Sequence, residues 1–176
     1  IDRAWNELIV NILTTKCSAP LAAVKGVAAT YRMTNRPPPK QASPFVATIL
    51  RPLEEFNKEF SSRTPEKIGN RWKQHIVVTV SDSYAAAVED LIETVQRTEA
   101  TLQNRGTRRK AAGGRMSDGE KVKLQLFLDY QAFEDHTLQV GVDPKTVIGI
   151  SKLQELTAPG KALFERISEE GSAINR

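Results

Sequence analysis

The chain has 176 residues, 40% of them hydrophobic and 6% aromatic, with 25 Lys and Arg against 21 Asp and Glu. This length allows one domain with a substantial core, and the composition excludes a low-hydrophobicity disordered chain. Because there is one cysteine, Cys17, an intramolecular disulfide and a Cys-cluster metal site are excluded, and His75 and His136 provide no ligand pair at helical spacing.

The chain begins with Ile1 instead of methionine and ends on a polar stretch, so we expect it to be a piece of a longer protein. The start lacks the charge order of a signal peptide. No stretch approaches the roughly 18 consecutive apolar residues of a membrane span. We therefore expect any membrane contact to be peripheral.

The first predicted helix covers about residues 2–31, and Pro20 should kink it. We expect Trp5, like Trp72 later in the chain, to be a core anchor and not a partner-binding residue. Cys17 lies among small residues and is interpreted as a buried small hydrophobe. The apolar positions of this helix are Trp5, Leu8, Ile9, Ile12, Leu13, Leu21, Val24, Val27 and Tyr31.

A linker at about 36–43 follows, and its three consecutive prolines, Pro37 to Pro39, force an extended connection. We interpret it as a stiff linker, with a ligand for a proline-recognition domain as the alternative. Ser43 and Pro44 then open a predicted helix at about 44–60. Pro52 should bend or split that helix at Arg51.

The clearest helix covers about 65–103, where apolar residues recur at steps of three and four. Thr64, Pro65 and Glu66 mark its start. It would be longer than a compact domain of this size is wide, so we expect either a rod or a kink near 81–83. Part of the stripe is a candidate contact with another subunit, namely Val88, Leu91, Val95 and Leu102.

A second linker, about 104–116, contains no acidic residue. We interpret it first as a solvated flexible linker, with contact to an acidic partner or anionic lipid as the alternative. Nucleic-acid binding is disfavoured because no aromatic residue interleaves with the arginines. Without its five basic residues the chain has 20 basic against 21 acidic residues; the five are Arg105, Arg108, Arg109, Lys110 and Arg115.

The remaining predicted helices cover about 117–140, 144–149 and 151–168. Ser117 with Glu120 forms a capping-box pattern for the first of these. Ser151 with Gln154 is expected to cap the last, with an interruption near Pro159 and Gly160. The predicted fold is all-α: an elongated stack or bundle of antiparallel amphipathic helices, forming a single domain over 1–176.

Motifs for catalysis are absent from the sequence: it has no phosphate-binding glycine loop, no GxSxG and no HExxH. The nearest group of titratable residues is Asp129, Glu134, Asp135 and His136. These point in different directions around one helix, so we interpret them as its polar outer face. We expect no catalytic residue, no metal and no cofactor.

Two blocks of sequence carry more specific information than the periodicity. The first comprises Tyr31, Arg32, Thr34, Asn35, Arg36, Pro39, Ala42, Ser43, Phe45, Val46, Leu50, Pro52 and Leu53. The second comprises Met116, Ser117, Asp118, Lys121, Leu124, Gln125, Leu126, Leu128 and Asp129, with Gly141, Ser151, Leu153, Glu155 and Leu156 after it. Both blocks resemble the C-terminal region of the conserved oligomeric Golgi complex subunit two, a family of helical-rod vesicle tethers, and Trp72, Tyr84 and Leu102 occupy matching places in the long helix between them.

This resemblance implies a non-catalytic subunit of an eight-subunit tether at the cytosolic face of the Golgi, acting in retrograde intra-Golgi transport and so in the retention of glycosylation enzymes. It implies stacked helices as the fold and the other tether subunits as partners, with SNAREs, small GTPases and golgins as further partners. Pro37, Pro38 and the basic residues of 104–116 depart from the family pattern. The alternative function is an adaptor domain that docks an anionic membrane or an acidic partner through 104–116.

Overall fold

The computed structural model describes residues 3–32, 34–104 and 116–174. These residues form α-helices and 3-10 helices and no strand, so the predicted all-α class is confirmed. The elements in chain order are α1 (Arg3–Ser18), η1 (Ala19–Lys25), α2 (Gly26–Tyr31), α3 (Val46–Ile49), α4 (Arg51–Phe60), α5 (Glu66–Asn104), α6 (Asp118–Gln139), η2 (Pro144–Thr146) and α7 (Ile148–Ile174).

Pro20 and Pro52 act where the sequence predicts. Around Pro20 the first helix tightens into the 3-10 segment η1 and resumes as α2 at Gly26. Pro52 occupies the first turn of α4, one residue after the break at Leu50 that separates it from α3. A proline in a first helical turn lacks only an N–H that has no intrahelical acceptor there, so the chain restarts a helix at each proline.

The long helix α5 is an unbroken rod of 39 residues, which corresponds to about 58 Å at 1.5 Å per residue. The kink considered near 81–83 is absent. Ser81 and Ser83 instead donate their hydroxyls to carbonyls of the preceding turn, Val78 and Thr79 among them. These hydroxyls are satisfied without opening the helix.

In the second half of the chain, the predicted start of α6 agrees with the structure, and the predicted start and interruption of the last helix, α7, do not. Ser117 and Glu120 form the predicted capping box, with the Glu120 N–H donating to Ser117 Oγ and the Ser117 N–H to Glu120 Oε2. The last helix begins at Ile148, so Ser151 is inside it and not a cap. The interruption expected near Pro159 is wrong, because α7 continues through this proline.

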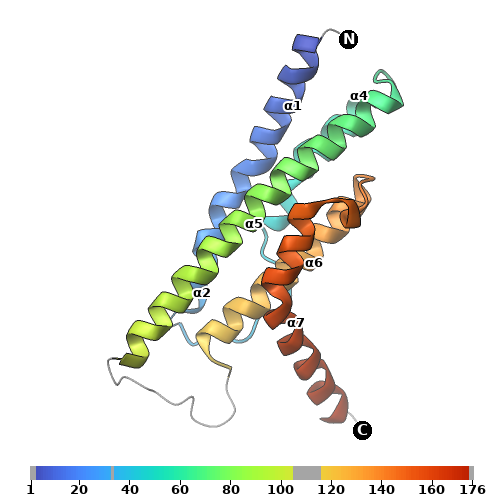
Figure 1. Cartoon of the computed structure of the whole chain (residues 1–176). Coiled ribbons are helices and arrows are strands. Elements are labelled where there is room, and N and C mark those ends of the chain that lie inside the picture. The colour runs from blue at the N-terminus through green and yellow to red at the C-terminus, as the bar shows by residue number, and fades with distance from the viewer. Residues whose placement is uncertain (1–2, 33, 105–115, 175–176) are drawn as a thin grey trace.

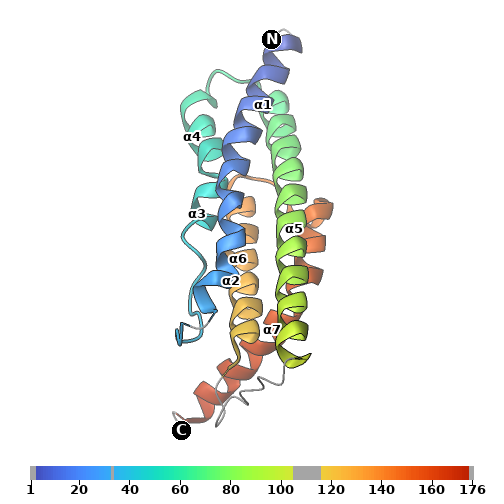
Figure 2. The same ribbon diagram turned by 90° about the vertical axis from the view of Figure 1, so that its left-hand side faces the viewer.

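The bundle is elongated, and its two chain ends lie at opposite ends (Figure 1). The arm formed by α1, η1 and α2 packs along α5 and runs in the same direction, because α3 and α4 return the chain to the end where α1 begins (Figure 2). α6 then runs back along both, and α7 reverses again across α6 and α5. The antiparallel arrangement predicted for the whole stack is thus wrong for the neighbouring pair α1 and α5.

The core is organised around Tyr84 at the middle of α5. Its ring meets Phe133 of α6 edge-on at a centroid distance of 5.3 Å and Phe45 at 6.4 Å. Trp72 is buried and its indole N–H donates to Asn6 Oδ1 at 3.1 Å. The sequence predicts Trp5 in the core as well, and this is wrong: Trp5 is 61% exposed, and Leu8 and Ile12 of the same helix are also exposed.

Within the described residues, one stretch, Arg3–Tyr31, is long and apolar enough to span a membrane by length and composition alone, with a mean hydropathy of 1.2. Core helices pass the same test. Here 22% of that window is buried inside the protein, so packing against the bundle accounts for only part of its apolar content. The buried residues are Leu13, Cys17, Leu21, Val24, Val27 and Tyr31.

Cys17 provides a direct test of this packing. Burial raises the pKa of its thiol to about 11, although a hydrogen bond with the backbone of Leu53 opposes the shift. The thiol has no exposed surface, and thiolate is the reactive form.

We expect Cys17 not to react with a thiol reagent at pH 8 until the protein is unfolded, and then to take up one full equivalent of the reagent. A matched variant with a surface thiol, Ala86→Cys, should react at once; fast labelling of Cys17 in the folded wild type would contradict the packing of α1.

Candidate interaction site

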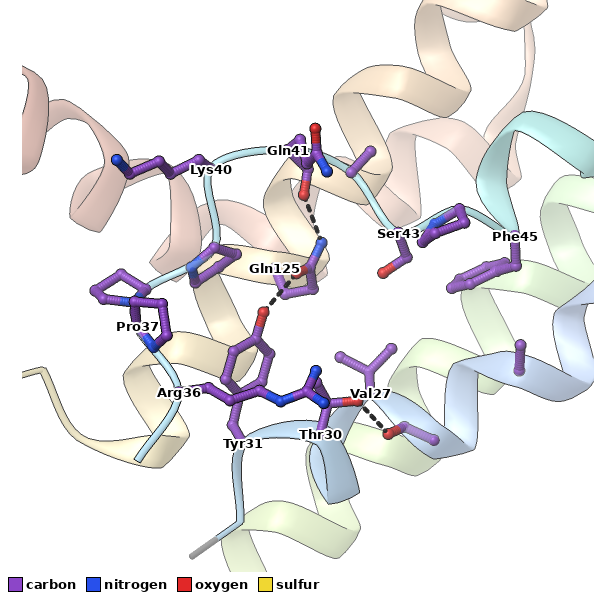
Figure 3. A pocket seen from close by; sticks show the side chains of 16 residues that line it. Val27, Thr30, Tyr31, Arg36, Pro37, Lys40, Gln41, Ser43, Phe45 and Gln125 are labelled. Carbon is purple, nitrogen blue, oxygen red and sulfur yellow. Dashed lines mark hydrogen bonds between the residues drawn. The ribbon is translucent and has the colours of Figure 1, made fainter. Parts of the chain in front are cut away.

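The connection from α2 to α3 arches over the bundle and encloses a groove of about 910 Å³. Figure 3 shows the arch running from Arg36 through Lys40 and Gln41 to Ser43, with Tyr31 and Gln125 beneath it. We call this the proline groove. Its lining comprises Ala23, Gly26, Val27, Thr30, Tyr31, Arg36 to Phe45, and Gln125.

Gln125 of α6 fastens the arch at two points. The Tyr31 hydroxyl donates to its Oε1 at 2.7 Å, and its Nε2 donates to the carbonyl oxygen of Gln41 at 3.0 Å. The same Nε2 donates to Asp129 Oδ1 at 2.8 Å. Both polar atoms of this buried amide are therefore satisfied, which removes the cost of burying them.

Asp129 holds the far end of the arch. Its Oδ1 accepts the backbone N–H of Ser43 at 2.6 Å, and its Oδ2 accepts the Ser43 hydroxyl at 2.9 Å. The carboxylate is fully buried, and burial raises its pKa, while the hydrogen bonds from Ser43 and Gln125 oppose the shift. No ion pair to Asp129 is present within the described residues.

Asp129 was interpreted as part of a polar outer face with Glu134, Asp135 and His136, and for Asp129 this is wrong. It lies three residues after Leu126 and four before Phe133, both buried, so it shares their face of α6. The spacing was visible in the sequence. What the sequence did not reveal is the partner, since Ser43 is 86 positions away.

The network joins the two blocks of sequence that carry the family resemblance. Tyr31 and Ser43 belong to the first block, and Gln125 and Asp129 to the second. Chemically this arrangement positions backbone and does not activate a nucleophile. Among the described residues no group of three or more His, Cys, Asp or Glu side chains could hold a metal ion.

The candidate subunit-contact stripe is partly covered by the chain itself. Val88 and Leu91 are 1% and 5% exposed and belong to the core, and Val95 is half-buried against it. The side chain of Leu102 is outside the described residues. So are the five predicted linker contacts, Arg105, Arg108, Arg109, Lys110 and Arg115.

Val95→Ser and Leu102→Ser test the stripe. Because Val95 packs on the core, replacing its side chain with that of serine should lower the free energy of unfolding by about 1 kcal/mol. Either variant is expected to weaken the fold or the recovery of a partner subunit. Thr94→Ser on the exposed side is the control and should change neither. Unchanged melting together with unchanged partner recovery in both stripe variants would rule out a role for these residues.

Comparison with known proteins adds an independent result. The family model described as COG complex component, COG2, C-terminal, matches residues 1–130. The conserved oligomeric Golgi complex subunit 2 of Dictyostelium discoideum is 31% identical over 164 residues, which cover 89% of this chain and 18% of the relative. The human protein of the same name is 27% identical over 160 residues, covering 87% of this chain and 22% of the relative.

The Arabidopsis thaliana protein of that name is likewise 27% identical, over 163 residues. The chain spans about a fifth of the length of these relatives. No solved structure matches it significantly. Since the family model covers well over half of the sequence, the chain belongs to the COG2 family and corresponds to the C-terminal region of its members.

Proposed function

We propose that this chain is a non-catalytic scaffolding module of a Golgi vesicle-tethering complex. The observation that carries the proposal is the family match over residues 1–130, together with relatives whose names identify them as subunit 2 of the conserved oligomeric Golgi complex. Through that complex the module would support retrograde intra-Golgi transport and thereby the retention of glycosylation enzymes.

The fold is suited to this role. A 39-residue helix with other helices packed along it gives an elongated body, and such a body can connect contacts at its two ends. The motif residues of the family bind each other instead of converging on a reactive centre. This favours a structural task for them over a catalytic one.

The closest partners in this proposal are the other subunits of the complex. SNAREs, small GTPases and golgins are further partners, and the site of action is the cytosolic face of Golgi membranes.

The tagged chain, mixed with cytosol and detergent-solubilised Golgi membranes, should recover other tether subunits, identified by mass spectrometry. A version with the five basic residues of 105–115 changed to Ser should recover them equally. Recovery of none by a chain with intact thermal melting would contradict the scaffolding role.

A second candidate function rests on the acid-free segment 104–116, whose five basic residues suit an anionic membrane or an acidic partner. Its described flanks, the C-terminal end of α5 and the N-terminal end of α6, lie at the same end of the bundle (Figure 2). Co-sedimentation with vesicles containing phosphatidylserine distinguishes this adaptor role. Binding that disappears in the Ser version would favour it, and equal sedimentation of both versions would exclude it.

A further inference from the structure

The segment that arches over the proline groove is held in place by hydrogen bonds to the helix beneath it. The arch is fixed at Tyr31, Gln41 and Ser43 by hydrogen bonds to α6, and between the first two of these points three consecutive prolines restrict the backbone. A frame that is ordered before binding spares a ligand the entropy of ordering it. The groove is therefore a preformed site.

Free space remains directly above α2. A Cβ atom added to Gly26 would meet no atom within 4 Å, although Gly26 lines the groove. The apolar lining residues include Ala23, Val27, Pro44 and Phe45. This part of the groove can accept an apolar side chain without displacing any residue of the protein.

The charge of the lining has one sign. Arg36 and Lys40 are exposed on the arch, and no Asp or Glu lines the groove. Neither cation forms an ion pair with the described carboxylates. The polar atoms of Gln125 beneath are occupied by Tyr31, Gln41 and Asp129. The groove thus offers apolar side chains on its floor, the charge of Arg36 reaching across it and the charge of Lys40 on its outer rim (Figure 3).

We propose that the proline groove binds an extended acidic segment of a partner protein, with an apolar side chain seated over Gly26 and a carboxylate beside Arg36 or Lys40. Its volume lies within the roughly 300–1,000 Å³ typical of ligand pockets. A concave site framed by extended backbone suits a polypeptide segment better than the flat surface of a bilayer. This binding does not require that the chain acts in a tether.

Fluorescence polarisation with defined peptides tests the proposal. The probes are labelled decapeptides that combine one or two leucines or phenylalanines with aspartates, compared with peptides in which lysine or glutamine replaces every aspartate. We expect the aspartate peptides to bind most tightly. Gly26→Phe should weaken binding about tenfold or more, because its ring occupies the seat of the apolar side chain. The double variant Arg36→Glu, Lys40→Glu should reverse the preference toward the lysine peptides.

Two controls separate the groove from general effects. Ala86→Phe adds the same ring on an exposed position of α5 and should leave peptide binding and thermal melting unchanged. Binding of phosphatidylserine vesicles should be indifferent to Gly26→Phe. If no aspartate peptide binds above the glutamine controls, or if Gly26→Phe with unchanged melting binds as well as wild type, the proposal is overturned. Vesicle binding that Gly26→Phe abolishes, without peptide binding, would overturn it in favour of a lipid ligand.

Discussion

Gly160→Ala is expected to lower the free energy of unfolding by about 3 kcal/mol, at the upper end of what overpacking costs. Gly160 lies where α7 crosses α6. An added Cβ would sit 2.8 Å from the Cβ of Phe127 and closer still to the carbonyl oxygen of Lys123. Because backbone cannot rotate away as a side chain can, α7 would have to move off α6. Chemical denaturation followed by circular dichroism measures the change.

A glycine-to-alanine substitution at a less crowded position should raise the free energy of unfolding instead of lowering it. At Gly69 of α5 the nearest atom to an added Cβ is Thr64 Cγ2 at 3.7 Å, which is ordinary contact. At Gly119 the obstacle is the flexible side chain of Glu99. Alanine favours a helix over glycine by about 0.5–1 kcal/mol, so Gly69→Ala should stabilise the protein. Gly160→Ala and Gly69→Ala with equal stability would show that α7 does not cross α6 at Gly160.

Asp129→Ala is the second large effect, with an expected loss of about 3 kcal/mol. The variant removes the acceptor of the Ser43 N–H and one of the two acceptors of the Gln125 amide, and a buried unpaired polar group costs about 1–3 kcal/mol. The arch would lose its anchor on α6. Asp135→Ala, on the exposed side of the same helix, is the control and should change stability by less than about 0.5 kcal/mol.

Asp129→Asn separates hydrogen bonding from charge. The amide oxygen can still accept from Ser43 N–H and Gln125, and the amide nitrogen can donate to the Ser43 hydroxyl. We therefore expect stability near that of wild type at neutral pH. A loss as large as that of the alanine variant would show that the negative charge itself is required.

The pH dependence has a defined sign. Burial raises the pKa of Asp129 in the folded protein, so the folded state keeps this proton at pH values where the unfolded state has lost it. The favourable contribution of Asp129 is complete below the pKa of the unfolded chain. It declines as pH rises through the raised folded value. The stability difference between wild type and Asp129→Asn should therefore move against wild type as pH increases over this window, and a difference independent of pH would contradict the shift.

Local signals in the sequence were sufficient for the long helix and the caps. The apolar stripe from Ile68 to Leu91 predicted α5, and Ser117 with Glu120 predicted the start of α6. Pro20 and Pro52 marked the change of helix type and the break at Leu50. These features depend on residues within one or two turns of each other, so the pattern alone determines them.

Features that depend on residues far apart in the sequence could not be predicted from local patterns. Pro159 does not end α7: before it Lys152 pairs with Glu89 of α5, and beyond it Phe164 and Arg166 still contact Phe127 and Glu120 of α6. Trp5 has the hydrophobicity of a core residue, yet it is exposed on α1, whose buried residues are Leu13 and Cys17. In both cases tertiary packing overrides the local preference.

The sequence by itself determined the helical class, most of the helix starts and the family of this protein. Only the tertiary structure decided which chain segments meet: the parallel course of α1 and α5, the burial of Asp129 against Ser43, and the groove beneath the three prolines. The physical reason is that helix periodicity specifies which face of a helix is buried, but it does not specify the partner of that face. The partner is chosen by close packing and by the pairing of buried polar groups, which join residues as far apart as Tyr31 and Gln125.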